Sequence, residues 1–101
     1  MSMIVIGATI KAKPGTDQQL IAKMEELAQA TEKEDGCLMY IFNQDTKDPN
    51  TILVYEQYKD QAAFDAHMGS DHFKTIGRAM GEFMDGRPEM KVYKKVAGFA
   101  K

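Results

Sequence analysis

Four stretches of the chain, at residues 3–12, 37–43, 51–58 and 90–96, carry apolar residues at every second position. This period is typical of β-strands, because successive side chains point to opposite faces of a sheet. One face of the third stretch carries Ile52, Val54, Glu56 and Tyr58, and the other carries Leu53, Tyr55 and Gln57. The fourth stretch has the weakest apolar pattern. We therefore predict four strands.

After the first predicted strand, residues 20–31 carry apolar side chains at the spacing of one face of a helix. Thr16 is expected to begin this helix, with Gln19 three residues later completing a capping box. Gly36 is expected to end it as the glycine just past the last turn.

A second helical stretch lies between the third and fourth predicted strands and is interrupted at Gly69-Ser70. Asp60 is predicted to cap its first segment, and Ser70 or Asp71 its second. The element order is then β-α-β-β-α-β. In a chain of this length, the order favours an α+β, ferredoxin-like fold, with a four-stranded antiparallel sheet covered by helices on one face.

The first two predicted strands are largely apolar on both faces, and the third is partly so. The open face of a one-sided sheet is normally polar. Isolated apolar residues are common on protein surfaces, but here neighbouring strands share the pattern. A second copy of the same sheet is the simplest cover, so we predict a homodimer that packs sheet to sheet.

Composition narrows the class of protein. A length of 101 residues corresponds to one domain, residues 1–101, and 44% apolar residues exclude a disordered chain. A net charge of −2 without a block of one sign argues against a nucleic-acid partner and an anionic membrane surface. The longest apolar run, residues 3–10, is too short to span a membrane. The single cysteine, Cys37, forms no internal disulfide, so we expect a reducing, cytoplasmic location.

Two histidines, His67 and His72, lie in the interrupted helical stretch. His67 falls three residues after Phe64, on the side expected to be buried. It can transfer protons near neutral pH, or it can be a buried residue bonded to a backbone carbonyl. Glu56 or Asp71 would complete a 2-His-1-carboxylate set of metal ligands. The two histidines are five residues apart across a helix break, however, so we predict no metal.

Glu56 shares its strand face with Val54 and Tyr58. A carboxylate in apolar surroundings has a raised pKa and can transfer protons, whereas an ion pair with Arg78 is the alternative. Tyr40 and Tyr58 either line an aromatic pocket or belong to the core. The chain has no phosphate-binding loop, dinucleotide fingerprint, CxxC or GxSxG motif, so we expect no tethered nucleotide or flavin cofactor.

Several short segments resemble, in order and spacing, those of the antibiotic biosynthesis monooxygenase family and its quinol monooxygenase and autoinducer-2-processing relatives. They are residues 34–40, 48–49, 56–58, 63–67 and 70–73. The resemblance implies a dimeric α+β barrel with a pocket between sheet and helices. Members are similar in sequence yet differ in chemistry. Some oxidise phenols or quinols without metal or flavin, some degrade haem, and some isomerise small phosphorylated sugars.

The resemblance also implies roles for individual residues. His67 resembles the family's histidine after the third strand, Glu56 and Tyr58 its pocket glutamate and aromatic residue, and Tyr40 its second-strand tyrosine. The chain departs from the family where Tyr58 replaces a common tryptophan and Asp35 a usual proline.

The leading expectation is a cofactor-independent monooxygenase acting on a small aromatic quinol or phenol. His67 would accept the phenolic proton with help from Glu56, and Tyr58 and Tyr40 would hold the ring. His72 and Asn43 are further expected substrate contacts, although Asn43 matches no family motif.

Two alternatives remain open at this point. An isomerase would use the same acid and base on a small, phosphorylated carbonyl compound. A non-catalytic stress-response dimer would only bind a small hydrophobic molecule. Oxygen uptake separates the first alternative from the monooxygenase, and tight binding without turnover identifies the second.

Overall fold

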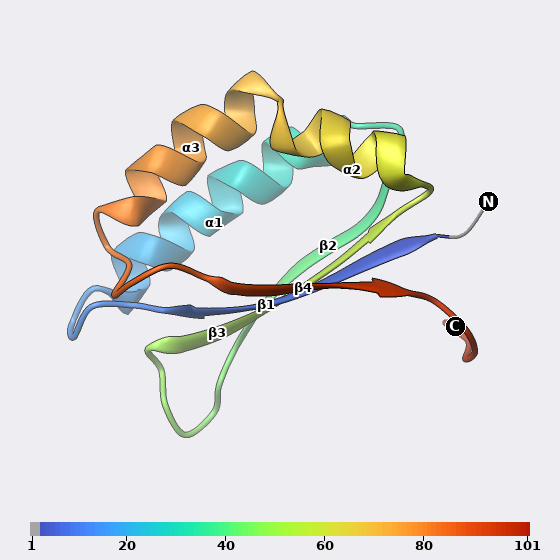
Figure 1. Ribbon diagram of the computed structural model, residues 1–101. Coiled ribbons are helices and arrows are strands. Elements are labelled where there is room, and N and C mark those ends of the chain that lie inside the picture. The colour runs from blue at the N-terminus through green and yellow to red at the C-terminus, as the bar shows by residue number, and fades with distance from the viewer. Residues whose placement is uncertain (1–2) are drawn as a thin grey trace.

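The computed structural model describes residues 3–101, which form a ferredoxin-like α+β fold with all helices on one face of a four-stranded sheet (Figure 1). The elements follow the predicted order, and the interrupted helical stretch forms two helices. They are β1 Ile4–Lys11, α1 Asp17–Thr31, β2 Cys37–Gln44, β3 Thr51–Tyr58, α2 Gln61–Met68, α3 Asp71–Gly81 and β4 Glu89–Lys94. The strand order is β2-β3-β1-β4, and all neighbouring strands are antiparallel.

The core lies between the helices and the face of the sheet that they cover. Every second residue of β1 and β3 faces it, as the alternation predicts, and α1 supplies an apolar stripe from the other side. Its large buried aliphatic members include Ile6, Ile10, Leu20, Met24, Leu27, Ile52 and Val54. Each such side chain stabilises the fold by about 1.5–3 kcal/mol relative to an exposed position.

The first helix begins where predicted, with Thr16 as its N-cap residue, but its capping bond and its C-terminal end differ from the prediction. The Thr16 hydroxyl lies 2.8 Å from the Lys13 carbonyl oxygen and 3.2 Å from that of Phe83, and it forms no cap bond with α1. The predicted capping box with Gln19 is therefore wrong, because the hydroxyl donates away from the helix. The helix also ends at Thr31, before the predicted Gly36.

Gly36 instead permits a close approach between two segments. A Cβ added there would lie 2.5 Å from the Cβ of Ala63 in α2. The Gly36 carbonyl accepts the backbone N–H of Lys59 at 2.9 Å, which ties the segment before β2 to the end of β3. The glycine is needed for packing and not for a helix cap.

The caps predicted after β3 are confirmed. The Asp60 carboxylate accepts the Ala63 N–H at 2.8 Å, and the Ser70 hydroxyl accepts the Phe73 N–H at 3.2 Å. Such caps contribute about 1 kcal/mol each. The Asp60 cap fixes the start of α2, and the Ser70 cap fixes the break between α2 and α3.

A bulge interrupts β2 near its start. Cys37 pairs with Tyr58, and the pairing then resumes at Met39 and Gln57, so that Leu38 is an extra residue. Leu38 is 53% exposed.

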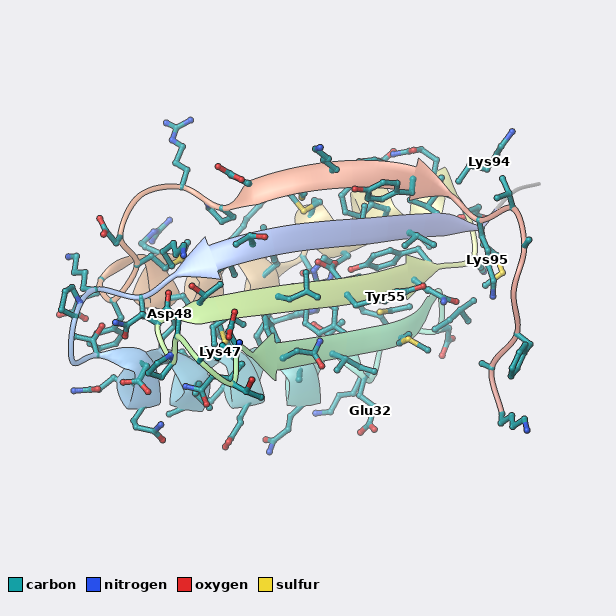
Figure 2. All side chains as sticks on the ribbon, turned by 90° about the horizontal axis from the view of Figure 1, so that it is seen from below. Glu32, Lys47, Asp48, Tyr55, Lys94 and Lys95 are labelled. Atoms are coloured by element: carbon teal, nitrogen blue, oxygen red, sulfur yellow. The ribbon has the colours of Figure 1, made fainter. Side chains whose placement is uncertain are left out.

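The opposite face of the sheet is open among residues 3–101 and carries apolar side chains (Figure 2). Ile41, Leu53 and Tyr93 are each about half exposed there. Tyr55 lies on β3 within this face, and the charged residues labelled in Figure 2 lie around its margin. The predicted surplus of apolar residues on the second face is thus present.

The fourth strand, β4, is the most exposed strand. It pairs only with β1, and all six of its residues are exposed. It begins one residue earlier and ends two residues earlier than the predicted range 90–96. No helix within residues 3–101 is both long and apolar enough to cross a membrane.

Candidate active site

A cavity of about 470 Å³ lies between the helix-covered face of the sheet and α3. The sheet contributes side chains from β2 and β3, and α3 contributes the facing wall. Its lining is mainly apolar and aromatic and includes Tyr40, Phe42, Val54, Phe73 and Met80. This size and lining suit a small organic molecule with an aromatic ring.

Glu56 is the one acidic side chain in the lining of this cavity among the described residues. It is 7% exposed, and its Oε1 accepts the Tyr58 hydroxyl at 2.6 Å. Burial raises the pKa of Glu56 to about 7, although the Tyr58 hydrogen bond acts in the opposite direction. The alternative ion pair with Arg78 is not found in the described part of the chain, so the carboxyl group is free to exchange a proton near neutral pH.

The two predicted tyrosines lie at different depths. Tyr40 lines the cavity, and burial raises the pKa of its hydroxyl above the usual range. Tyr58 is fully buried behind the cavity wall and reaches it only through its hydrogen bond to Glu56. Tyr40 can therefore touch a ligand directly, whereas Tyr58 adjusts the carboxyl group that does so.

His67 lies behind the cavity wall and is not among its lining residues. It is 1% exposed, and its ring centroid is 5.2 Å from that of Tyr40 and 5.0 Å from that of Phe73. Its Nδ1 lies 2.8 Å from Glu34 Oε2, so Nδ1 carries the hydrogen that the carboxylate accepts. Burial lowers the pKa of His67, partly offset by Glu34. The neutral ring therefore presents Nε2 as an acceptor.

Glu34 is the functional candidate that the sequence reasoning missed. Its Oε2 also lies 2.6 Å from Nε2 of His72, and the Ser70 hydroxyl lies 3.2 Å from the same nitrogen. His72 thus belongs to this polar cluster and not to the cavity wall. Glu34 precedes β2, 33 and 38 residues before the two histidines, and no spacing rule connects residues so far apart.

Within residues 3–101, a metal ion could be held by Glu34, His67 and His72. Their ligand atoms all lie within 4.8 Å of one another, and two imidazoles with one carboxylate are a common ligand set for zinc and iron. The carboxylate differs from the Glu56 or Asp71 considered in the sequence.

The side chains of Asn43 and Cys37 lie apart from the cavity. Asn43 is exposed, and its amide nitrogen donates to the Leu53 carbonyl oxygen at 3.1 Å, away from Glu56. Cys37 packs beside Ile6 and Tyr58, and burial raises the pKa of its thiol to about 11. A thiol of this kind is a poor nucleophile at neutral pH.

The fold is that of a small ferredoxin-like α+β domain with a cavity between sheet and helices that is lined by one buried carboxyl group, and the comparisons with known proteins identify the family. Residues 3–79 match the antibiotic biosynthesis monooxygenase family. The chain therefore belongs to this family, as the resemblance of its short segments predicts. Family membership supports a general monooxygenase-like role on a small molecule.

Individual relatives agree with this assignment. The chain is 32% identical over 72 residues to the Bacillus subtilis protein named "Putative monooxygenase YcnE", which covers 71% of this chain and 76% of that protein. It is 29% identical over 91 residues, or 90% of this chain, to an uncharacterised protein of Synechocystis, sll1783, of whose length it spans 62%.

Solved structures share the whole fold. A conserved protein from Methanosarcina mazei has a TM-score of 0.89 at 32% identity, covering 95% of each chain. A Caulobacter crescentus structure named "putative antibiotic biosynthesis monooxygenase" has a TM-score of 0.90 at 31% identity, covering 95% of this chain and 92% of that one.

Proposed function

We propose that this protein is a monooxygenase that oxidises a small aromatic quinol or phenol with dioxygen and without a bound cofactor. The observation that carries the proposal is Glu56, an acid with a pKa of about 7 in the wall of an aromatic cavity. An acid or base with a pKa near the working pH is the most effective for proton transfer. Tyr40 and Phe73 offer ring faces against which an aromatic substrate can stack.

In the proposed reaction, the Glu56 carboxylate first accepts a phenolic proton from the substrate. The electron-rich phenolate passes one electron to dioxygen, and the resulting superoxide and aryl radical combine to form a carbon–oxygen bond. The peroxide takes the proton back from Glu56, and its oxygen–oxygen bond breaks as the same ring carbon loses its hydrogen. The products are water and a quinone if the substrate is a phenol, or water and a hydroxylated quinone if it is a quinol, so the substrate ring supplies all four electrons that dioxygen takes up.

His67 is the second candidate for the proton acceptor. Glu34 accepts its Nδ1 hydrogen, an arrangement that fixes the ring and leaves Nε2 able to accept a proton. This Nε2 is buried without a hydrogen-bond partner among residues 3–101. Because His67 lies behind Tyr40 and Phe73, it would need those side chains to move before it could reach a substrate, and Glu56 would not.

The decisive experiment is oxygen uptake by metal-stripped protein with a panel of reduced quinols and polyphenols. The Glu56→Gln variant keeps an oxygen that can accept the Tyr58 hydrogen bond but loses the acid–base group, so its kcat is expected to fall by 10²-fold or more. Glu32→Gln, an exposed position, is the matched control and should retain full activity.

The companion variant His67→Ala tests the other candidate. Loss of uptake in this variant, with the circular dichroism spectrum retained and Glu56→Gln still active, would transfer the role of base to His67. Uptake no faster than autoxidation in the wild type across the whole panel would overturn the monooxygenase proposal. Proton transfer without oxygen, or binding alone, would then be the function to test.

We also propose that two copies assemble through the open faces of their sheets. Exposed Ile41, Leu53 and Tyr93 on that face support this assembly, since large apolar patches usually mark interfaces. The helix-covered cavity lies on the other face, so such a dimer leaves one complete cavity in each copy.

A further inference from the structure

Three basic side chains line one side of the active-site cavity. Lys74 and Arg78 lie four residues apart on α3, and hence on one face of that helix, and Arg87 follows in the segment before β4. Gly86, with a φ of 84°, turns the chain just before Arg87. Residues from two segments thus bring three positive charges to one cavity.

These charges have no acidic partner in the part of the chain that the structure describes. The ion pairs found among residues 3–101 involve other side chains. Glu82 and Asp85 lie between the basic residues in sequence, but neither lines the cavity. The one acidic residue in the lining, Glu56, has its hydrogen bond with Tyr58 instead.

The cavity therefore has two chemically different parts. Its inner part is apolar and aromatic around Tyr40, Phe42 and Phe73, and the basic residues are exposed at the α3 side. A neutral ring would fill the inner part and leave the basic residues unused. A ring with an anionic substituent would satisfy both parts, because guanidinium groups bind carboxylate and phosphate with paired hydrogen bonds.

We propose that the ligand of this cavity is an aromatic compound that carries an anionic group, a carboxylate or a phosphate, held by Lys74, Arg78 and Arg87. The ring lies against Tyr40 and Phe73, and its hydroxyl group faces Glu56. This inference names the substrate class of the proposed function and rests on the same cavity. It concerns binding, so it can be tested without turnover.

The test is calorimetric binding of a matched pair of air-stable probes, 1-naphthol and 1-hydroxy-2-naphthoate, which differ only by the carboxylate. The carboxylate is expected to bind at least about tenfold more tightly at low salt, corresponding to about 1.4 kcal/mol. The difference should shrink at high ionic strength, because the basic residues are exposed and therefore screened. A third probe, 1-naphthyl phosphate, carries a phosphate in place of the hydroxyl group, so its affinity relative to 1-naphthol shows whether the cavity also binds a phosphate.

Charge-removing variants locate the effect. The double variant Arg78→Gln and Arg87→Gln should bind the two naphthalene probes with nearly equal affinity, because only the anionic probe loses its partners. Lys33→Gln, an exposed position just after the end of α1, is the control and should bind like the wild type. Both variants leave Glu56 and the aromatic wall unchanged.

Equal affinity of the wild type for 1-naphthol and 1-hydroxy-2-naphthoate would overturn the inference. So would a preference that persists in the double variant, or the failure of every probe to bind folded protein. The preference together with no oxygen uptake would leave the anion site established and the monooxygenase proposal rejected. Preference for the phosphate with no uptake would favour the isomerase alternative.

Discussion

Glu56 and Tyr58 lie two residues apart on β3 and face the same way, so the tyrosine hydroxyl reaches the carboxyl group at 2.6 Å. Burial favours the neutral acid, and the hydrogen bond favours the carboxylate. The Tyr58 hydrogen bond therefore lowers the pKa of Glu56 and increases the fraction of the carboxyl group that is ionised, and able to act as a base, at a given pH. Activity that depends on this base should rise with pH through about 7.

Tyr58→Phe should move this rise in kcat/KM to higher pH. Without the hydroxyl, the buried carboxylate loses a donor worth about 1.5–3 kcal/mol, which corresponds to a pKa increase of about one to two units. The measurement is the pH profile of oxygen uptake. Tyr55→Phe is the matched control, since its hydroxyl accepts from Gln57 elsewhere. An identical profile for Tyr58→Phe and wild type would show that another group controls the base.

The sequence predicted part of this site for a clear reason. Alternation along β3 places Glu56 and Tyr58 on one face whatever surrounds the strand, so their proximity was predictable. The contact of Glu34 with His67 joins a loop to a helix 33 residues later, and it depends on how those elements pack. The structure places Asn43 outside the lining of the cavity, with its side chain bonded to the neighbouring strand, and the alternation along β2 does not indicate this bond.

Among the secondary-structure elements, local rules worked where one side chain decides the geometry. The caps at Asp60 and Ser70 are examples, because each satisfies a backbone N–H within its own turn. The rules failed where distant packing competes. The Thr16 hydroxyl bonds to Phe83, and Gly36 lies against α2 and not at a helix end.

Gly36→Ala should lower the free energy of unfolding by about 1–3 kcal/mol, because overpacking forces α2 and the segment before β2 apart. The clash is with the Cβ of Ala63 at 2.5 Å. Gly81→Ala is the control. A Cβ at this last residue of α3 has no neighbour within 4 Å, and alanine favours a helix, so stability should not fall. Urea denaturation measures both. Equal midpoints for Gly36→Ala and the wild type would refute the packing role.

For the whole molecule, the open face of the sheet is the feature that no single helix or strand explains. Its apolar residues were predictable, because both faces of the strands carry apolar side chains in the sequence. No local pattern in the sequence specifies the surface that would cover them. Leu53, which pairs with Thr9 on β1 and Asn43 on β2, lies on this face at 52% exposure.

Leu53→Glu should convert the proposed dimer to a monomer, because each interface would then bury two like charges. Light scattering after gel filtration gives the mass directly. Gln18→Glu adds the same charge at an exposed position of α1 and should leave the mass unchanged. A wild type that is monomeric, or a Leu53→Glu variant with an unchanged dimer mass, would contradict the proposed assembly.

The exposed strand β4 contributes side chains both to the cavity and to the open face of the sheet. Met90 forms part of the cavity wall, whereas the Tyr93 ring lies on the open face, where a Cβ added to Gly7 would be 3.3 Å from it. A strand that pairs with one neighbour is among the first elements to unfold locally. A ligand that binds only when this strand is ordered loses binding free energy to the ordering of the strand. A second copy packed on Tyr93 would order the same strand beforehand. Subunit association and ligand binding would then be thermodynamically linked, each strengthening the other by the same factor, so ligand affinity would rise over the concentration range in which the protein assembles.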